Sequence, residues 1–175
     1  MLSFARVRAL AIVSVLFIGA LVAVSLALSR DPGSVLAGDG GCPAGSVPAN
    51  LELPAVNSVR IHVYNATDQA GLASQVGENF ANRDFEVLQR GDDPLGTEVE
   101  GVAVLRYGPA AVGAAHVLQA YFLNAAETQF DIEREDDVVD VVIGNQFRQL
   151  ATETEVRQSI AALGNPEAPP GTCRA

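Results

Sequence analysis

Polar side chains that can bind a ligand alternate with apolar ones along an early strand-like segment. This alternation predicts a half-buried strand and puts Arg60, His62 and Tyr64 together on its outer face. Asp140 joins that face if residues 138–143, the clearest strand pattern in the chain, lie in the same sheet. Charged and imidazole groups hydrogen-bond to glycan hydroxyls, and a tyrosine ring offers a stacking surface. The competing interpretation is a face that is solvated or covered by a helix.

A second candidate ligand site follows this strand directly, at Asn65-Ala66-Thr67. A turn between a strand and a helix can present backbone N–H groups to a ligand, which makes Asn65 and Thr67 candidate binding residues. The alternative is turn chemistry alone. In that case Asn65 adopts an unusual φ and Thr67 caps the next helix.

The charge balance excludes several classes of function. All 11 cationic residues are arginines, against 21 acidic residues, and the formal net charge is −10. Such a chain lacks the basic face that nucleic acid requires, so no nucleic-acid partner is expected. Without lysine it has no Walker-type phosphate loop and no Schiff-base nucleophile. Nine of the arginines follow Ser29, together with all 21 acidic residues, so the later part of the chain has no polycationic arm.

No catalytic or metal-binding motif stands out. Two Cys and two His are too few for a conventional zinc site, and neither G-x-S-x-G nor H-E-x-x-H occurs. The densest acidic run, residues 131–140, lacks EF-hand spacing and is interpreted as a polar hairpin turn. We therefore expect no catalytic residue, no metal and no cofactor. Paired carboxylates for glycoside hydrolysis remain an alternative, because their separation is not visible in the sequence.

The N-terminal segment predicts the compartment. Residues 9–29 are uncharged over a length that spans about 30 Å as a helix, close to one hydrocarbon core. Arg6 and Arg8 precede the segment, so residues 1–8 are expected in the cytoplasm and the rest of the chain outside. The prediction is a single-pass membrane protein with an extracytoplasmic domain. A signal peptide cleaved near Ser25-Leu26-Ala27 is one alternative. A lipoprotein is a weaker one, because Asp39-Gly40-Gly41 before Cys42 is not the usual lipobox.

The exterior part divides into three segments. Residues 30–56 are rich in Gly, Pro and Ala and are expected to form a linker. Residues 57–148 alternate strand and helix patterns in the order β-α-β-β-α-β, with one extra short strand near Phe130. This order predicts an α+β fold, an α/β two-layer sandwich with helices on one sheet face. Residues 149–175 contain a C-terminal helix, with capping-box spacing at Thr152 and Glu155.

The two cysteines flank the domain, with Cys42 before it and Cys173 near the end of the chain. Outside the membrane a disulfide is chemically permitted, and one intramolecular bridge would join the entry and exit segments. Intermolecular pairing and free thiols are the alternatives.

Four short motifs follow one another along the exterior domain, namely Val59–Thr67 with Ala70–Ala73, Phe85–Val87, Arg106–Gly108, and Val141–Phe147. Together they make the domain resemble the LytR C-terminal domain family of Gram-positive envelope proteins. Asp84 stands where that family usually has Gly, and Gln146 where it usually has Asp.

The resemblance implies a role in the cell envelope. The full-length LytR-CpsA-Psr enzymes carry a separate catalytic domain for glycopolymer transfer, and this chain has no room for it. We therefore expect a non-catalytic, membrane-anchored module that supports envelope integrity by binding a cell-wall glycan or another envelope protein. The alternative is a small cell-wall hydrolase or transferase. The Arg-only, Ala- and Val-rich composition fits an actinobacterial source with high G+C content.

Overall fold

The structure is a computed structural model that describes residues 42–175. The predicted anchor, residues 9–29, lies outside the described residues. Within them, no helix is long and apolar enough to cross a membrane. The described residues belong to one compact unit with its own hydrophobic core.

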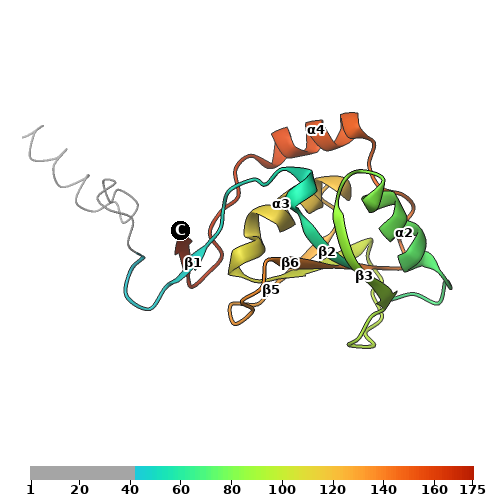
Figure 1. The fold of residues 1–175 in the computed structure, drawn as a ribbon, viewed down its shortest axis with the longest axis horizontal. Coiled ribbons are helices and arrows are strands. Elements are labelled where there is room, and N and C mark those ends of the chain that lie inside the picture. Colours follow the sequence, from blue (N-terminus) through green and yellow to red (C-terminus); the bar gives the residue numbers. More distant parts are fainter. Residues whose placement is uncertain (1–41) are drawn as a thin grey trace, which may run out of the picture. The chain divides into compact units, whose positions relative to one another are not determined.

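The centre of this unit is a mixed five-stranded sheet with the order β3-β2-β6-β4-β5 (Figure 1). Strand β2 is parallel to both β3 and β6, β4 is parallel to β5, and β4 is antiparallel to β6. The strands of this sheet are β2 (Arg60–Asn65), β3 (Glu86–Asp92), β4 (Ala103–Tyr107), β5 (Glu127–Phe130) and β6 (Val138–Ile143).

Two β-α-β units build the sheet, and β6 joins them. Helix α2 (Leu72–Ala81) connects β2 to β3, and α3 (Val112–Tyr121) connects β4 to β5. Short 3-10 helices precede β2 (η1, Val56–Ser58) and α3 (η2, Pro109–Ala111). The predicted order of elements is confirmed as a mixed α/β fold with a sheet and three helices, consistent with the α+β class.

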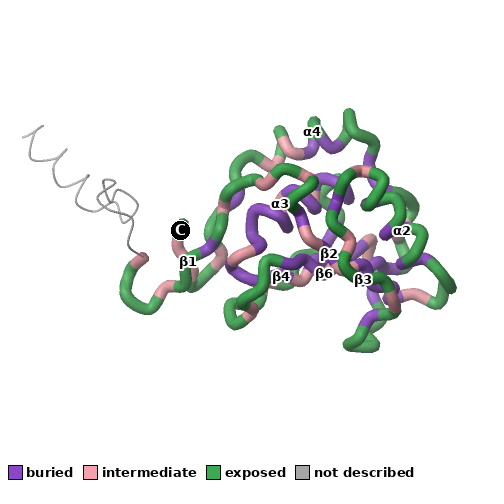
Figure 2. The backbone as a smooth tube through the Cα atoms, viewed as in Figure 1, coloured by how far each residue is buried: buried purple, intermediate pink, exposed green. Residues whose placement is uncertain are grey.

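The core lies between the sheet and helices α2 and α3. Apolar residues at helical spacing bury one face of α2, whereas α3 is buried on nearly all sides, and alternate residues of the central strands meet both helices. Figure 2 shows the buried residues gathered in α3 and the central strands. The buried apolar residues in and beside the two helices include Leu72, Ala73, Val76, Phe80, Ala111, Ala115, Leu118 and Phe122.

Helix α4 (Glu153–Leu163) has the predicted capping box, in which Thr152 and Glu155 bond reciprocally. The helix contacts α3 and lies on the side of α3 away from the sheet (Figure 1). It therefore adds a partial third layer to the predicted two-layer sandwich, and it does not cover the outer sheet face.

One local prediction was wrong. The acidic run was interpreted as a hairpin turn, but β5 and β6 are not paired, because β4 lies between them. Residues 131–137 are instead a loop that leads from the sheet edge back to its centre. Elsewhere, Arg90, Gly91 and Asp92 extend β3 to the end of β2, paired up to Asn65↔Asp92.

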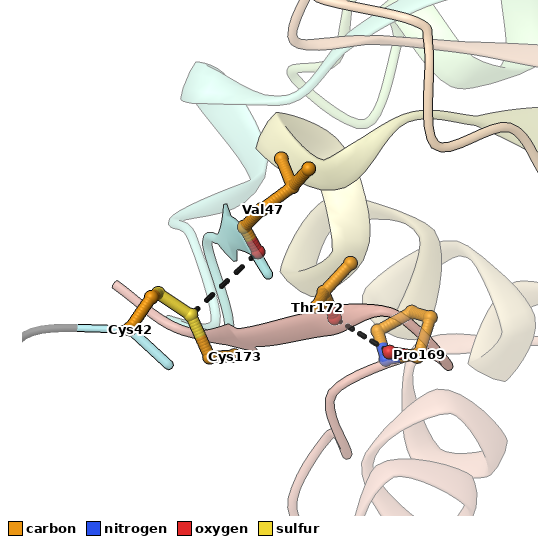
Figure 3. Close-up of a disulfide and its surroundings, with 5 residues drawn as sticks. All are labelled: Cys42, Val47, Pro169, Thr172 and Cys173. Atoms are coloured by element: carbon orange, nitrogen blue, oxygen red, sulfur yellow. Dashed lines mark hydrogen bonds between the residues drawn. A yellow bond between two sulfur atoms is a disulfide. The ribbon is translucent and has the colours of Figure 1, made fainter. Parts of the chain in front are cut away.

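The entry and exit segments pair with each other in a small separate sheet. Strand β1 (Val47–Ala49), within the segment expected as a linker, is parallel to β7 (Thr172–Arg174). A disulfide joins Cys42 to Cys173, with the Cα atoms 5.7 Å apart. Figure 3 shows Cys173 beside the Val47 carbonyl, and the Thr172 hydroxyl hydrogen-bonded to the Pro169 carbonyl. The intramolecular pairing, one of three alternatives from the sequence, is the one that the structure contains.

Asp84, which stands where the family usually has Gly, adopts a left-handed backbone with φ of +68°. An L residue in this region is strained, and glycine is not. We expect Asp84→Gly to raise the free energy of unfolding in urea by about 0.5–1 kcal/mol. Asn82→Gly, at a helical φ of −67°, is the matched control and should lower it. Destabilisation by Asp84→Gly would contradict the strain argument.

Candidate functional site

The outer sheet face brings together side chains from two neighbouring strands, as predicted. His62 and Asp140 are register partners, and His62 Nδ1 lies 2.9 Å from Asp140 Oδ1. Arg134, from the loop before β6, donates to both Asp140 oxygens at 2.7 and 3.2 Å and to Asp136 at 2.9 Å. Burial lowers the pKa of Arg134, but these carboxylate hydrogen bonds outweigh it and leave the pKa raised. The Asp140 carboxylate is thus shared between two partners of its own chain.

The other two predicted residues of this face are also engaged. Arg60 Nη1 donates to Asp137 at 2.6 Å, and its Nε lies 3.9 Å from Glu86. Tyr64 is only 7% exposed, in a small cluster with Val99 and Val142. Burial and, secondarily, the charge of Asp140 raise the pKa of Tyr64. Little of its ring is left for a sugar to stack on, and a ligand for Arg60 must compete with Asp137.

A salt bridge that the sequence did not reveal lies beside these residues, because Arg106 is the register partner of Asp140 on the neighbouring strand. The Asp93 side chain is 2% exposed and Arg106, on β4, is 12% exposed. Two guanidinium nitrogens of Arg106 donate to the two Asp93 oxygens at 2.6 and 3.1 Å. Burial raises the pKa of Asp93, but hydrogen bonds from Arg106 and Thr97 outweigh it and lower the pKa to about 2. This salt bridge fixes the loop that follows β3, in which Val99 packs onto Tyr64.

The turn at the end of β2 satisfies its own polar groups. Asn65 Oδ1 accepts from the Thr67 amide at 3.1 Å and from the Thr67 hydroxyl at 2.8 Å, and Asn65 Nδ2 donates to the Gln69 carbonyl at 3.0 Å. Asn65 does not have a positive φ, and the N-cap of α2 is Gly71. The expectations of an unusual φ at Asn65 and a helix cap at Thr67 were therefore wrong. Asn65 instead organises an Asx-type turn.

Three residues that shape the outer face were missed at the sequence level, namely Asp93, Arg106 and Arg134. Alternation along β4 does place Arg106 on the outer face, since its neighbours Leu105 and Tyr107 point into the main core. Nothing local marks the partners of these residues, because both ion pairs join a loop to a strand. Within residues 42–175 no group of three His, Cys, Asp or Glu side chains is arranged to hold a metal ion.

The fold and its motifs define the class of protein. The sequence profile of the LytR_C family, described as "LytR cell envelope-related transcriptional attenuator", matches residues 58–147. The matched region runs from the entry to β2 through the segment that follows β6. The chain belongs to the LytR_C family.

The chain is similar to one curated relative and to one solved structure. The chain is 26% identical to the cell envelope integrity protein Cei of Mycobacterium tuberculosis over 172 residues, which cover 89% of this chain and 79% of Cei. Its fold is similar to that of the soluble domain of a conserved hypothetical secreted protein from Mycobacterium marinum. The TM-score is 0.53 at 24% identity, over 74% of this chain and 81% of the other. The family and Cei together indicate a cell envelope-related module.

Proposed function

We propose that this chain is a non-catalytic, membrane-anchored extracytoplasmic module that supports cell envelope integrity by binding a cell-wall polymer. The observation that carries the proposal is the LytR_C match, together with similarity to Cei over most of the chain. The uncharged residues 9–29 supply the anchor, and the disulfide suits an oxidising exterior.

The chemistry of the outer face lends no support to a catalytic role. In the described part of the chain, Asp140 is the only side chain that hydrogen-bonds to His62. In a catalytic triad a carboxylate orients a histidine, and the histidine activates a Ser or Cys that is hydrogen-bonded to its ring. Both cysteines of the chain are in the disulfide. The His62–Asp140 pair therefore serves the ion-pair network of the sheet.

The test is retention of residues 38–175 on protease-treated cell-wall polymer, in parallel with a membrane-protein fraction. We expect saturable retention on the polymer and no release of soluble saccharide. An Arg60→Gln/His62→Gln variant should be retained equally, because both side chains are engaged within the chain. Saccharide release would favour the hydrolase alternative. Recovery of one defined membrane protein without polymer retention would replace polymer binding with a protein-scaffold role.

A further inference from the structure

A groove runs between α2 and the segment that follows β6. Its volume is about 480 Å³, within the range of small-ligand sites and enough for one or two sugar rings. The floor is apolar, because Leu72, Val76 and Leu150 are buried there and the half-buried Phe147 lies beside them. The groove is on neither the outer sheet face nor the acidic loop.

The rim of the groove is rich in carboxamides. Gln75 and Asn79 line it from α2, and Gln149 lines it from the opposite segment. Asn79 Nδ2 donates to the Gln75 backbone carbonyl at 3.0 Å, which fixes the amide and leaves its oxygen as an acceptor. The side chains of Gln75 and Gln149 make no hydrogen bond within residues 42–175. An amide offers donors and an acceptor together, as sugar hydroxyl and acetamido groups require.

The charge of the groove is opposite to that of the chain. Arg83 and Arg148 line it and no carboxylate does, although acidic residues outnumber arginines by 21 to 11. Within residues 42–175 neither arginine has a carboxylate within 4.0 Å, whereas Arg60, Arg106 and Arg134 all do.

The two arginines are held differently. Arg83 is anchored, because its Nη1 donates to the Ala151 carbonyl at 2.5 Å and its guanidinium carbon lies 5.7 Å from the Tyr121 ring centroid. Arg148 is exposed, and its one hydrogen bond within the described residues is a 3.4 Å contact with the Phe147 carbonyl. Most guanidinium donors of the pair are therefore free to meet an anion.

The carboxylate of Glu155 lies near the rim, beside the lining residue Thr152, but is already engaged. Glu155 accepts from the Thr152 amide and hydroxyl, both at 2.7 Å, as part of the capping box of α4. These hydrogen bonds lower the pKa of Glu155 and hold its carboxylate at the helix start. The Glu155 carboxylate therefore does not pair with Arg83 or Arg148, and their guanidinium donors stay available to a ligand.

We propose that this groove binds an acidic saccharide unit of a cell-wall polymer. The shared chemistry is a carboxylate or phosphate held by Arg83 and Arg148, with the sugar ring against Phe147 and the apolar floor. The carboxamides bind the hydroxyl or acetamido groups. This inference rests on the proposed polymer-binding function and locates its site.

A smaller hollow of about 140 Å³ extends the groove toward the end of β2. It shares Gln69, Leu72, Phe147 and Arg148 with the groove. Its far end is lined by Thr67, Asp68 and Asn145, so the acidic group of a ligand is expected at the arginine end. The extended surface thus borders two of the family motifs, Val59–Ala73 and Val141–Phe147. An elongated path of this kind suits a polymer rather than an isolated small molecule.

The experiment is a nuclear magnetic resonance titration of isotope-labelled residues 38–175, which contain the compact unit. The probes are N-acetylmuramic acid, N-acetylglucosamine 6-phosphate and neutral N-acetylglucosamine. We expect saturable shifts clustered at residues 69–79 and 147–152 with an acidic probe, and at least about tenfold weaker binding of the neutral sugar. The two acidic probes distinguish a carboxylate from a phosphate as the anion.

Two variants and one control test the charge argument. Arg148→Gln should weaken binding about tenfold, and Gln75→Glu, which puts a carboxylate on the rim, should abolish it. Gln158→Glu makes the same change in net charge on an exposed position of α4 and should bind as the unchanged chain does. Each variant is first checked for an unchanged melting temperature.

The outcomes separate this inference from the proposed function. If the chain is retained on wall polymer but Gln75→Glu and Arg148→Gln are retained equally, the groove assignment is overturned and polymer binding stands. Shifts that cluster on the outer sheet face have the same consequence. If the unchanged chain is not retained on the polymer at all, both proposals fall.

Discussion

Removal of the Cys42–Cys173 disulfide is expected to lower the free energy of unfolding by about 4 kcal/mol. The bridge joins residues 131 positions apart, so it restricts almost the whole unfolded chain. The chain-entropy argument gives about 4–5 kcal/mol for a loop of this length, as an upper figure. We therefore expect Cys42→Ser/Cys173→Ser to lower the melting temperature of residues 38–175 by roughly 10 °C or more.

The measurement is urea unfolding of the double variant beside the oxidised chain, together with thiol titration under native conditions. The oxidised chain should show no titratable thiol. Amide exchange should accelerate at β1 and β7, whose pairing the bridge supports, and stay slow at β6 in the core. A loss of less than about 1 kcal/mol would mean that the bridge constrains little of the unfolded chain. Two reactive thiols would mean that it does not form.

Local sequence patterns predicted most of the fold because they report burial directly. The strand 138–143 was predicted with the bounds that the structure shows, because it is a run of β-branched residues. The start of the helix 153–163 was predicted from its capping box, and Gly164 follows its last residue. The pairing of β1 with β7 was not predictable. Each strand has three residues in Gly- and Pro-rich sequence, and only the distant partner stabilises it.

In the candidate site, too, local properties were predictable and contacts with distant segments were not. Alternation correctly placed Arg60, His62 and Asp140 on one sheet face, because side-chain direction is a local property of a strand. Alternation did not show that Arg60 is already paired with Asp137 and Asp140 with Arg134. These two partners come from a loop whose course depends on the whole sheet. The groove could not be predicted from the sequence for the same reason, because its two walls are about 70 residues apart in the chain.

Asp93→Ala is expected to destabilise the chain by about 3–5 kcal/mol. The Asp93 carboxylate is buried and accepts from Arg106, from the amides of Leu95 and Thr97 and from the Thr97 hydroxyl. Its removal leaves the nearly buried Arg106 guanidinium without a counter-charge, which is the costly way to break a buried pair. The loop that carries Val99 onto Tyr64 should loosen with it.

A neighbouring aspartate and a double-mutant cycle isolate the pair. Asp92 is exposed, and Asp92→Ala should change the free energy of unfolding by no more than about 0.5 kcal/mol. The double variant Asp93→Ala/Arg106→Ala should cost less than the sum of the single variants, with a coupling of at least about 1 kcal/mol. Additive costs would show that Asp93 acts on the loop alone and not through Arg106.

The pH dependence of stability tests the charge on Asp93 separately from its shape. Its pKa falls from 3.8 to about 2 in the folded chain, because hydrogen bonds from Arg106 and Thr97 outweigh the effect of burial. The ionised pair therefore contributes its full stabilisation above about pH 4, and this contribution is lost as the pH falls through 2. The depression corresponds to roughly 2 kcal/mol. We expect the difference in unfolding free energy between the unchanged chain and Asp93→Asn to shrink by that amount between pH 5 and pH 2. A difference that stays constant over this range would mean that the pair does not depend on the charge of Asp93.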